Sequence, residues 1–305
     1  MRIDEVIRAF KDTLHEQLAT RNVLDRALHA ALRKLGYADF DEYRVEYIIE
    51  GKLITFSPTH IGTSAEDPYS PIDKPIVKIR GLTPYIPGSS LRGVLRGFIE
   101  RLAIARGVMK PYVRIRIVGS QEIEIGCTGE SLSDAYSALS RDEVRRALLN
   151  LDEATLSDLI CKCLCSPVVG LFGGPWLASH VTILDAYPTS EVRTIVLQRV
   201  AIDRFTGTQK PGLLYSLEAV EPGAEWLFKM KIVNVDLESG SSDIRIELIK
   251  SMLEILIEGI QIGGRRSVGL GLVKLVEPTY KIVRVTPDKG LVVEGPKPLN
   301  QLLRR

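Results

Sequence analysis

The hydrophobic period changes near residue 43, and this change limits the fold more than any other feature of the sequence. In the first 36 residues, apolar side chains recur at helical spacing in two amphipathic stretches, and Gly36 stops the second. After the change, apolar and polar residues alternate as they do in a β-strand. Strands and helices then follow one another without strict alternation, which predicts an α+β fold with an antiparallel or split βαβ sheet.

The same patterns predict where the elements lie. We expect strands at 45–56, 76–79, 113–118, 181–184, 194–200, 213–220, 226–235 and 272–276. For the first, a hairpin that turns near Gly51 is the alternative. We expect helices at 91–106, 133–149, 153–164 and 243–258, with Ser242 as the N-cap of the last. Residues 203–212 form a polar turn long enough to protrude between two strands. The organisation that follows is an N-terminal helical extension at 1–42, a main domain at 43–295 and a C-terminal tail at 296–305.

Composition supports a sizeable core and excludes several classes of protein. The chain has 305 residues, of which 45% are hydrophobic, and its 40 basic side chains exceed the 38 acidic ones by a net charge of +2. These values exclude an acidic disordered chain, and no uninterrupted apolar run approaches the about 18 residues of a membrane span. Acidic residues within the first five positions argue against a secretory signal. We therefore expect a cytoplasmic protein with no membrane partner.

The cysteines are expected to be free thiols. They are Cys127, Cys161, Cys163 and Cys165. A chain with a sizeable core and no secretory signal does not need disulfides, and alternating cysteines are not a common zinc pattern. The alternative is a zinc site formed by Cys161, Cys163 and Cys165, which His180 could join.

Two segments favour the binding of phosphate. The turn Pro87-Gly88-Ser89-Ser90 opens a helix whose N-terminus can hold an anion, with Ser89 or Ser90 as cap and Arg92 and Arg96 beside it. From 92 to 116 there are seven basic residues and one acidic residue, which predicts a local basic field. The alternative is an ordinary capped surface helix.

The second segment is a glycine loop at 263–271, which follows a helix and precedes a strand. That order, and the lack of a Gly-Lys-Ser/Thr ending, exclude a P-loop and a dinucleotide fingerprint. Its glycines can bring backbone N–H groups close to a ligand, and its arginines add positive charge. The residues predicted to bind here are Gly263, Gly264, Arg265, Arg266 and Ser267.

Five motifs in chain order resemble those of the RAMP (repeat-associated mysterious protein) superfamily of CRISPR systems. They lie at 59–62 with 72–76, at 87–96, at 171–173 with 185–188, at 202–207 and at 263–271. Each motif alone is modest, but five in the right order are specific. Within the superfamily the chain is most similar to the repeated backbone subunit of type III effector complexes.

This resemblance implies a modified ferredoxin-like (RRM-type) palm with an inserted thumb hairpin and helical insertions. Copies of such a subunit, or paralogues, stack head-to-tail along a guide RNA, bind complementary target RNA and contact other type III effector subunits. The thumb displaces a base pair at regular intervals. Here we expect the thumb around residues 203–212, with Arg204 and Lys210 as RNA contacts.

The resemblance also implies metal-dependent cutting of the target RNA by an aspartate, with Mg²⁺ or Mn²⁺ as cofactor. By motif the catalytic and metal-binding residue is Asp73, with Asp67 and Glu66 as runners-up and His60 as a less favoured general base. The structural alternative for Asp73 is a hydrogen bond to its own proline-flanked turn.

Two alternative functions stay open. One is a catalytically inactive, architectural RNA-binding subunit of the same complex. The other is a CRISPR repeat-processing endoribonuclease, which shares the glycine loop and typically works alone with a histidine and no metal. The Pro-Gly-Ser-Ser helix argues against the second alternative.

Overall fold

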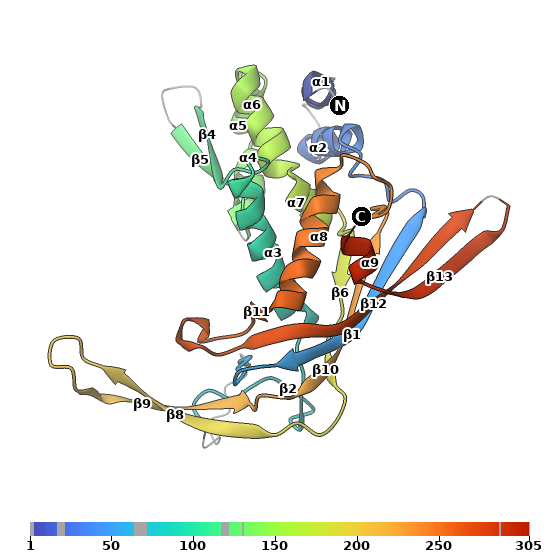
Figure 1. Cartoon of the computed structure of the whole chain (residues 1–305). Helices are drawn as coiled ribbons and strands as arrows, with labels where there is room; N and C mark the ends of the chain where they lie inside the picture. Colours follow the sequence, from blue (N-terminus) through green and yellow to red (C-terminus); the bar gives the residue numbers. More distant parts are fainter. Residues whose placement is uncertain are drawn as a thin grey trace.

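The computed structural model describes residues 3–16, 22–63, 72–116, 122–129, 131–286 and 288–304. Its centre is an antiparallel sheet with helices packed over one face (Figure 1). The strands are β1 (Val45–Thr55), β6 (Val181–Ile183), β7 (Tyr187–Pro188), β10 (Glu225–Val233), β11 (Ile260–Gln261), β12 (Leu272–Thr286) and β13 (Gly290–Pro298). The main order is β11-β12-β1-β10-β6, with β13 paired to β12 and β7 paired to β10.

The central strand β1 shows why the two faces of the sheet differ. Its residues Tyr47, Ile49 and Leu53 are fully buried, as the alternation in the sequence predicts. Charged residues that alternate with the buried ones lie on the other face and form ion pairs across the strands: Glu46 with Lys231, Glu50 with Lys229 and Lys281, and Lys52 with Glu225. Because these lysines already have carboxylate partners, a surface for phosphate has to be sought elsewhere.

Two long helices cover the buried face. They are α3 (Gly88–Ala105) and α8 (Ile244–Glu258), which contact each other and the short α7 (Pro167–Phe172). The first was predicted from the Pro-Gly-Ser-Ser turn that opens it and the second from its apolar face, and both are confirmed. The predicted N-cap of α8 is wrong by one position, because the Asp243 carboxylate, and not Ser242, accepts the backbone N–H of Arg245 at 2.9 Å.

The remaining helices form a second layer beyond α3 and α8. The predicted N-terminal helices are confirmed as α1 (Ile3–Glu16) and α2 (Val23–Lys34), which pack on α6 (Glu153–Leu159) and on the π-helix Ile160–Leu164. The single helix predicted at 133–149 is two helices, α4 (Ser131–Leu139) and α5 (Asp142–Leu148). At the C-terminal end, α9 (Asn300–Leu303) packs on the fold through the buried Leu302.

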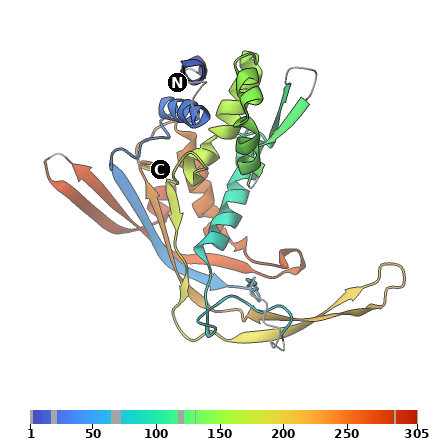
Figure 2. The same cartoon turned by 180° about the vertical axis from the view of Figure 1, so that it is seen from behind.

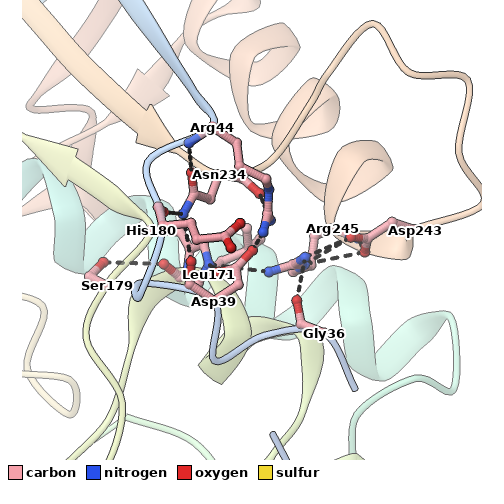
Figure 3. Close-up of polar contacts among 10 residues, drawn as sticks. Gly36, Asp39, Arg44, Leu171, Ser179, His180, Asn234, Asp243 and Arg245 are labelled. Carbon is pink, nitrogen blue, oxygen red and sulfur yellow. Dashed lines mark hydrogen bonds and ion pairs between the residues drawn. The ribbon is translucent and has the colours of Figure 1, made fainter. Parts of the chain in front are cut away.

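A buried polar cluster joins the segment after α2 to the main domain (Figure 3). His180 is fully buried, and its Nε2 lies 2.8 Å from Oδ1 of Asp39. Arg245, at the start of α8, donates to the Gly36 carbonyl at 3.2 Å. Its guanidinium also lies over the ring of Tyr37, 4.5 Å from the centroid. The N-terminal helices are thus fastened to the rest of the chain by buried contacts and not only by the linker.

A long hairpin leaves the sheet on the side opposite the N-terminal helices (Figures 1 and 2). It consists of β8 (Thr194–Ile202) and β9 (Gln209–Val220). The turn between them includes most of the predicted protruding segment, and we call β8, β9 and this turn the thumb. Two small hairpins complete the described strands: β2 (Lys78–Ile79) with β3 (Thr83–Pro84), and β4 (Tyr112–Arg116) with β5 (Glu122–Gly126). Positions 117 and 118 of the strand predicted at 113–118 lie outside the described residues. The predicted α+β class is confirmed.

The expectation of free cysteines is wrong for two of the four. Cys127, which follows β5, forms a disulfide with Cys163 in the π-helix. Cys161 and Cys165 keep free thiols, and Cys165 is fully buried. The disulfide forms because packing brings the residue after β5 next to a helix 36 positions later in the chain. The Cys163 sulfur is therefore bonded to another sulfur and does not act as a thiolate ligand.

The run from Glu153 to Phe172 is apolar and long enough to cross a bilayer by length and composition alone. However, 72% of its most apolar window is buried inside the protein. Its side chains pack against the N-terminal helices, α3 and α8, as those of a core helix do.

Candidate nucleic-acid interface

The N-terminus of α3 was predicted to bind an external anion, but a side chain of the protein already binds there. The backbone N–H of Gly88 donates to Oδ1 of Asp185 at 2.7 Å, so a carboxylate of the protein already occupies this position. A Cβ at Gly88 would overlap the carbonyl oxygen of Ile183, which explains the glycine. Ser89 is exposed and Ser90 is partly buried, and neither side chain caps the helix. The Pro-Gly-Ser-Ser turn therefore docks α3 on the segment between β6 and β7.

The arginines of the first turns of α3 also have partners within the protein. Arg92 donates to the Phe172 carbonyl and lies over that residue's ring, and burial lowers the pKa of Arg92. Nε of Arg96 lies 2.9 Å from Oε1 of Glu100. Three more cations of the stretch 92–116 are ion-paired: Arg106 with Glu247, Lys110 with Asp158 and Arg114 with Glu124. The predicted basic field is thus largely neutralised by the fold.

Unpaired positive charge gathers instead around one open groove. The groove has a volume of about 930 Å³ and lies between α3, the end of α8, β11 and the glycine loop. Its lining includes Val94, Phe98 and Arg101 of α3, together with Arg265 and Arg266 of the loop. All three arginines are exposed, and across the described part of the chain none of them forms an ion pair. This groove has unpaired positive charge of the kind that binds the phosphates of an RNA backbone.

The glycine loop needs its glycines in order to dock. Gly263 has a φ of +73°, and a Cβ there would overlap the carbonyl oxygen of His60. The N–H of Gly264 donates to the same oxygen at 2.8 Å. Gly271, with a φ of +86°, donates its N–H to the Pro58 carbonyl at 2.9 Å. The loop therefore lies against the segment 58–60, which joins two predicted site regions.

The loop also contacts the base of the thumb. The Arg265 guanidinium lies 5.1 Å from the ring centroid of Tyr215 in β9. Arg266 and Ser267 begin a short 3₁₀ turn and are exposed to solvent. The cations of the groove thus reach the hairpin that the resemblance associates with target RNA.

His60 is buried rather than presented to a substrate. The residue is only 8% exposed, and its Nδ1 donates to the Glu218 carbonyl at 2.7 Å. With its carbonyl oxygen holding Gly264 as well, this residue fits a structural role. The position does not fit a general base, which has to reach the reacting hydroxyl.

Asp73 is exposed and held by the thumb strand. Its Oδ2 accepts the N–H of Ser216 at 2.7 Å and the hydroxyl of Ser216 at 2.8 Å. These two hydrogen bonds hold the pKa of the Asp73 carboxyl below its usual range. Among the described residues no donor lies within hydrogen-bonding distance of Oδ1. The described hydrogen-bond partner of Oδ2 is therefore a residue of the thumb strand, 143 positions away in the chain.

The thumb presents both cations and apolar side chains to solvent. Arg204 and Lys210 lie at its end and are exposed. Phe205 is fully exposed, at 101%, in a turn where Oδ1 of Asp203 accepts the N–H groups of Phe205 and Thr206. Further exposed apolar residues lie along the strands: Val196, Val200, Ile202, Leu213 and Leu214. Such a surface suits contact with bases as well as with phosphates.

Asp73 is the predicted metal-binding residue that the structure describes, and it offers one carboxylate oxygen without a hydrogen bond to the described residues. Across the described residues, no group of three or more His, Cys, Asp or Glu side chains could bind a metal. Asp67 and Glu66 lie outside the described residues. One free carboxylate oxygen is a sparse site for an ion held by protein alone, but it fits an ion that phosphate oxygens also bind.

The sequence interpretation missed several residues of this region. Arg101 was only one member of the basic stretch, although Val94, Phe98 and Arg101 recur at helical spacing on one face of α3. That spacing is a usable signal. Tyr215 and Ser216 carry no such signal, because only the pairing of β8 with β9 and the docking of the loops bring them to the site.

One family model matches the part of the chain that contains all of these features. The model of the RAMP superfamily matches residues 52–274, a range that contains the groove, the thumb, the glycine loop and Asp73. A comparison with curated proteins gives no match. Since the family model covers well over half of the chain, the protein belongs to the RAMP superfamily.

Proposed function

We propose that the chain is a repeated backbone subunit of a type III CRISPR effector complex. It binds guide RNA in the groove and cuts the complementary target RNA beside Asp73. Copies stacked head-to-tail along the guide would then cut the target at regular intervals. The family supports a CRISPR-associated RNA-binding module, and the finer assignment depends on the arrangement at the base of the thumb.

One observation carries the proposal. Tyr215 contacts Arg265 of the groove, and the next residue of β9, Ser216, holds Asp73. Successive residues of a strand point to opposite faces, so the cations and the carboxylate lie on the two sides of the thumb base. An RNA strand that crosses this base from the groove would come next to the carboxylate.

The chemistry of this arrangement is in-line attack by an RNA 2′-hydroxyl on the adjacent phosphate. The 2′-oxygen loses its proton and bonds to phosphorus, the bond from phosphorus to the 5′-oxygen of the next nucleotide breaks, and the products are a 2′,3′-cyclic phosphate and a protonated 5′-hydroxyl. The thumb would splay a nucleotide so that its hydroxyl and phosphate can align. Asp73, together with phosphate oxygens, would hold the Mg²⁺ or Mn²⁺ ion, which when bound offsets the negative charge that develops on the phosphate.

The proposal is tested by Asp73→Asn in the reconstituted complex with labelled target RNA. We expect target cutting to fall on the order of 100-fold or more, while binding of guide RNA is unchanged. The matched control is Asp134→Asn, which alters an exposed aspartate on α4, far from the groove in sequence. Cutting at the wild-type rate by the Asp73 variant would exclude the catalytic assignment.

The second candidate is an architectural subunit with the same RNA groove and no nuclease activity. The observation that favours it is the single carboxylate oxygen available at Asp73 among the described residues. A wild-type complex that binds target RNA but leaves it intact in Mg²⁺ and in Mn²⁺ would establish this function. The repeat-processing alternative is weakened by the burial of His60, and cutting of precursor RNA by the isolated protein in EDTA would revive it.

A further inference from the structure

The Asp73 loop is fastened to one strand of the thumb by reciprocal hydrogen bonds. Ser216 donates its N–H and its hydroxyl to Oδ2 of Asp73, and its Oγ accepts the backbone N–H of Asp73 at 2.9 Å. The next residue, Lys74, continues the pairing: its N–H donates to the Ser216 carbonyl at 3.1 Å, and its carbonyl accepts the N–H of Glu218 at 3.0 Å. The loop thus runs parallel to β9 at this point and pairs with it through one isolated β-bridge, between Lys74 and Leu217.

Glu218 forms a second anchor on the same face of β9. It is only 3% exposed, and its two carboxylate oxygens accept the N–H of Ile76 at 3.1 Å and the ammonium of Lys78 at 2.6 Å. Its carbonyl accepts Nδ1 of His60. Because residues two apart on a strand face the same side, Ser216 and Glu218 hold the segments 59–62 and 72–78 against one side of the thumb base.

These contacts leave Asp73 little freedom of its own. Both its backbone N–H and one carboxylate oxygen are bound to a single serine, so the side chain is held with Oδ1 as its unengaged oxygen. The serine is only 7% exposed, whereas Asp73 is open to solvent. A buried hydrogen-bonding residue commonly orients an exposed reacting group in this way, and Ser216 stands in that relation to Asp73.

We propose that Ser216 is the positioning residue of Asp73 and makes the carboxylate move with the thumb. Beyond Tyr215 the same strand runs on into the exposed part of the hairpin, where its pairing with β8 shifts register between Val200 and Ile202. A displacement of the thumb by bound RNA is therefore transmitted to the carboxylate through two hydrogen bonds, one from the Ser216 backbone N–H and one from its hydroxyl, and cutting becomes dependent on thumb engagement. This inference rests on the proposed function of Asp73.

The test compares Ser216→Ala with Ser216→Thr in the reconstituted complex. The alanine removes the hydroxyl that bridges to Asp73, and the threonine keeps it. We expect Ser216→Ala to lower the cutting rate, or to raise the Mn²⁺ concentration for half-maximal cutting, by about 10- to 100-fold. We expect Ser216→Thr to restore most of the loss. The control Ser137→Ala removes an exposed serine hydroxyl on α4 that bonds only within its own helix.

Binding of guide RNA reports on folding in every variant. If Ser216→Ala fails to bind guide RNA, Ser216→Cys keeps the size of the side chain while replacing the strong donor, and the same loss of cutting is expected. Wild-type cutting and wild-type Mn²⁺ dependence in a folded Ser216→Ala or Ser216→Cys variant, with Asp73→Asn inactive, would overturn the positioning role alone. Full activity of Asp73→Asn would overturn the proposed function as well.

Discussion

The salt dependence of RNA binding gives the sharpest prediction for the groove, and the perturbation is Arg265→Ala. Each arginine that neutralises a phosphate of single-stranded RNA contributes about 0.7 to the slope of log K against log salt. The groove holds three arginines without ion-pair partners among the described residues, Arg101, Arg265 and Arg266. Their joint share of the slope is therefore about 2.

This share corresponds to a loss of affinity of about 18-fold between about 50 and about 200 mM salt. Removing Arg265 is expected to lower the slope by about 0.7, so that the groove's share of the loss falls to about 7-fold. Since the contacts are made to phosphate, the weakening should be nearly equal for RNAs of different sequence.

The assay is a fluorescence anisotropy titration of labelled guide-length RNA at several salt concentrations. The control is Arg106→Ala, which removes the C-cap arginine of α3, whose guanidinium is paired with Glu247. We expect this variant to keep the wild-type slope. Equal slopes for Arg265→Ala and wild type, or an equal decrease in both variants, would refute the argument that only unpaired groove cations bind phosphate.

Three further predictions concern stability. Gly263→Ala forces a Cβ against a carbonyl oxygen at a φ of +73° and should cost about 1–3 kcal/mol, seen as a lower Tm and weaker RNA binding; an unchanged Tm would contradict it. Arg284 lowers the pKa of Asp236 to about 2, so this pair stabilises the fold above the unfolded pKa and its contribution is lost as pH falls toward about 2. Between the unfolded pKa and pH about 2, the free energy of unfolding of wild type should fall by about 1 kcal/mol more than that of Asp236→Asn, a figure already discounted for solvent exposure. Denaturant titrations measure both, and equal decreases in the two proteins would contradict the prediction. Cys127→Ser removes a disulfide of sequence separation 36 and should lower the free energy of unfolding by about 3–4 kcal/mol. If a reductant leaves the Tm of the wild-type protein unchanged, the disulfide does not contribute this stability.

Much of the fold could be predicted because it depends on neighbours in the chain. The alternation in β1 and the apolar stripes of α3 and α8 follow from burying one face of a strand or helix. The protruding turn at 203–212 was visible as a polar interval between two strands. The five motifs identified the superfamily that the family model confirms.

The sequence could not show which of the predicted cations are free to bind RNA. Arg92 and Arg96 were expected to face RNA, but their partners are a carbonyl on α7 and a carboxylate one turn along α3. The N-terminus of α3 was expected to be open to an anion, but Asp185, 97 positions away, binds it. In each case packing supplies a partner that the linear pattern does not reveal.

The sequence by itself determined the class of the fold, the main helices and strands, the thumb and the residues that carry the family motifs, because hydrophobic period and turn chemistry act locally. Only the tertiary structure decided which cations are free and which carboxylate is held. Arg106, the C-cap of α3, is neutralised by Glu247 from 141 positions away, while Arg101 in the last turns of that helix lies open in the groove. The physical reason is that electrostatic and hydrogen-bond partners are chosen by distance across the folded chain, which sheet register and helix packing set.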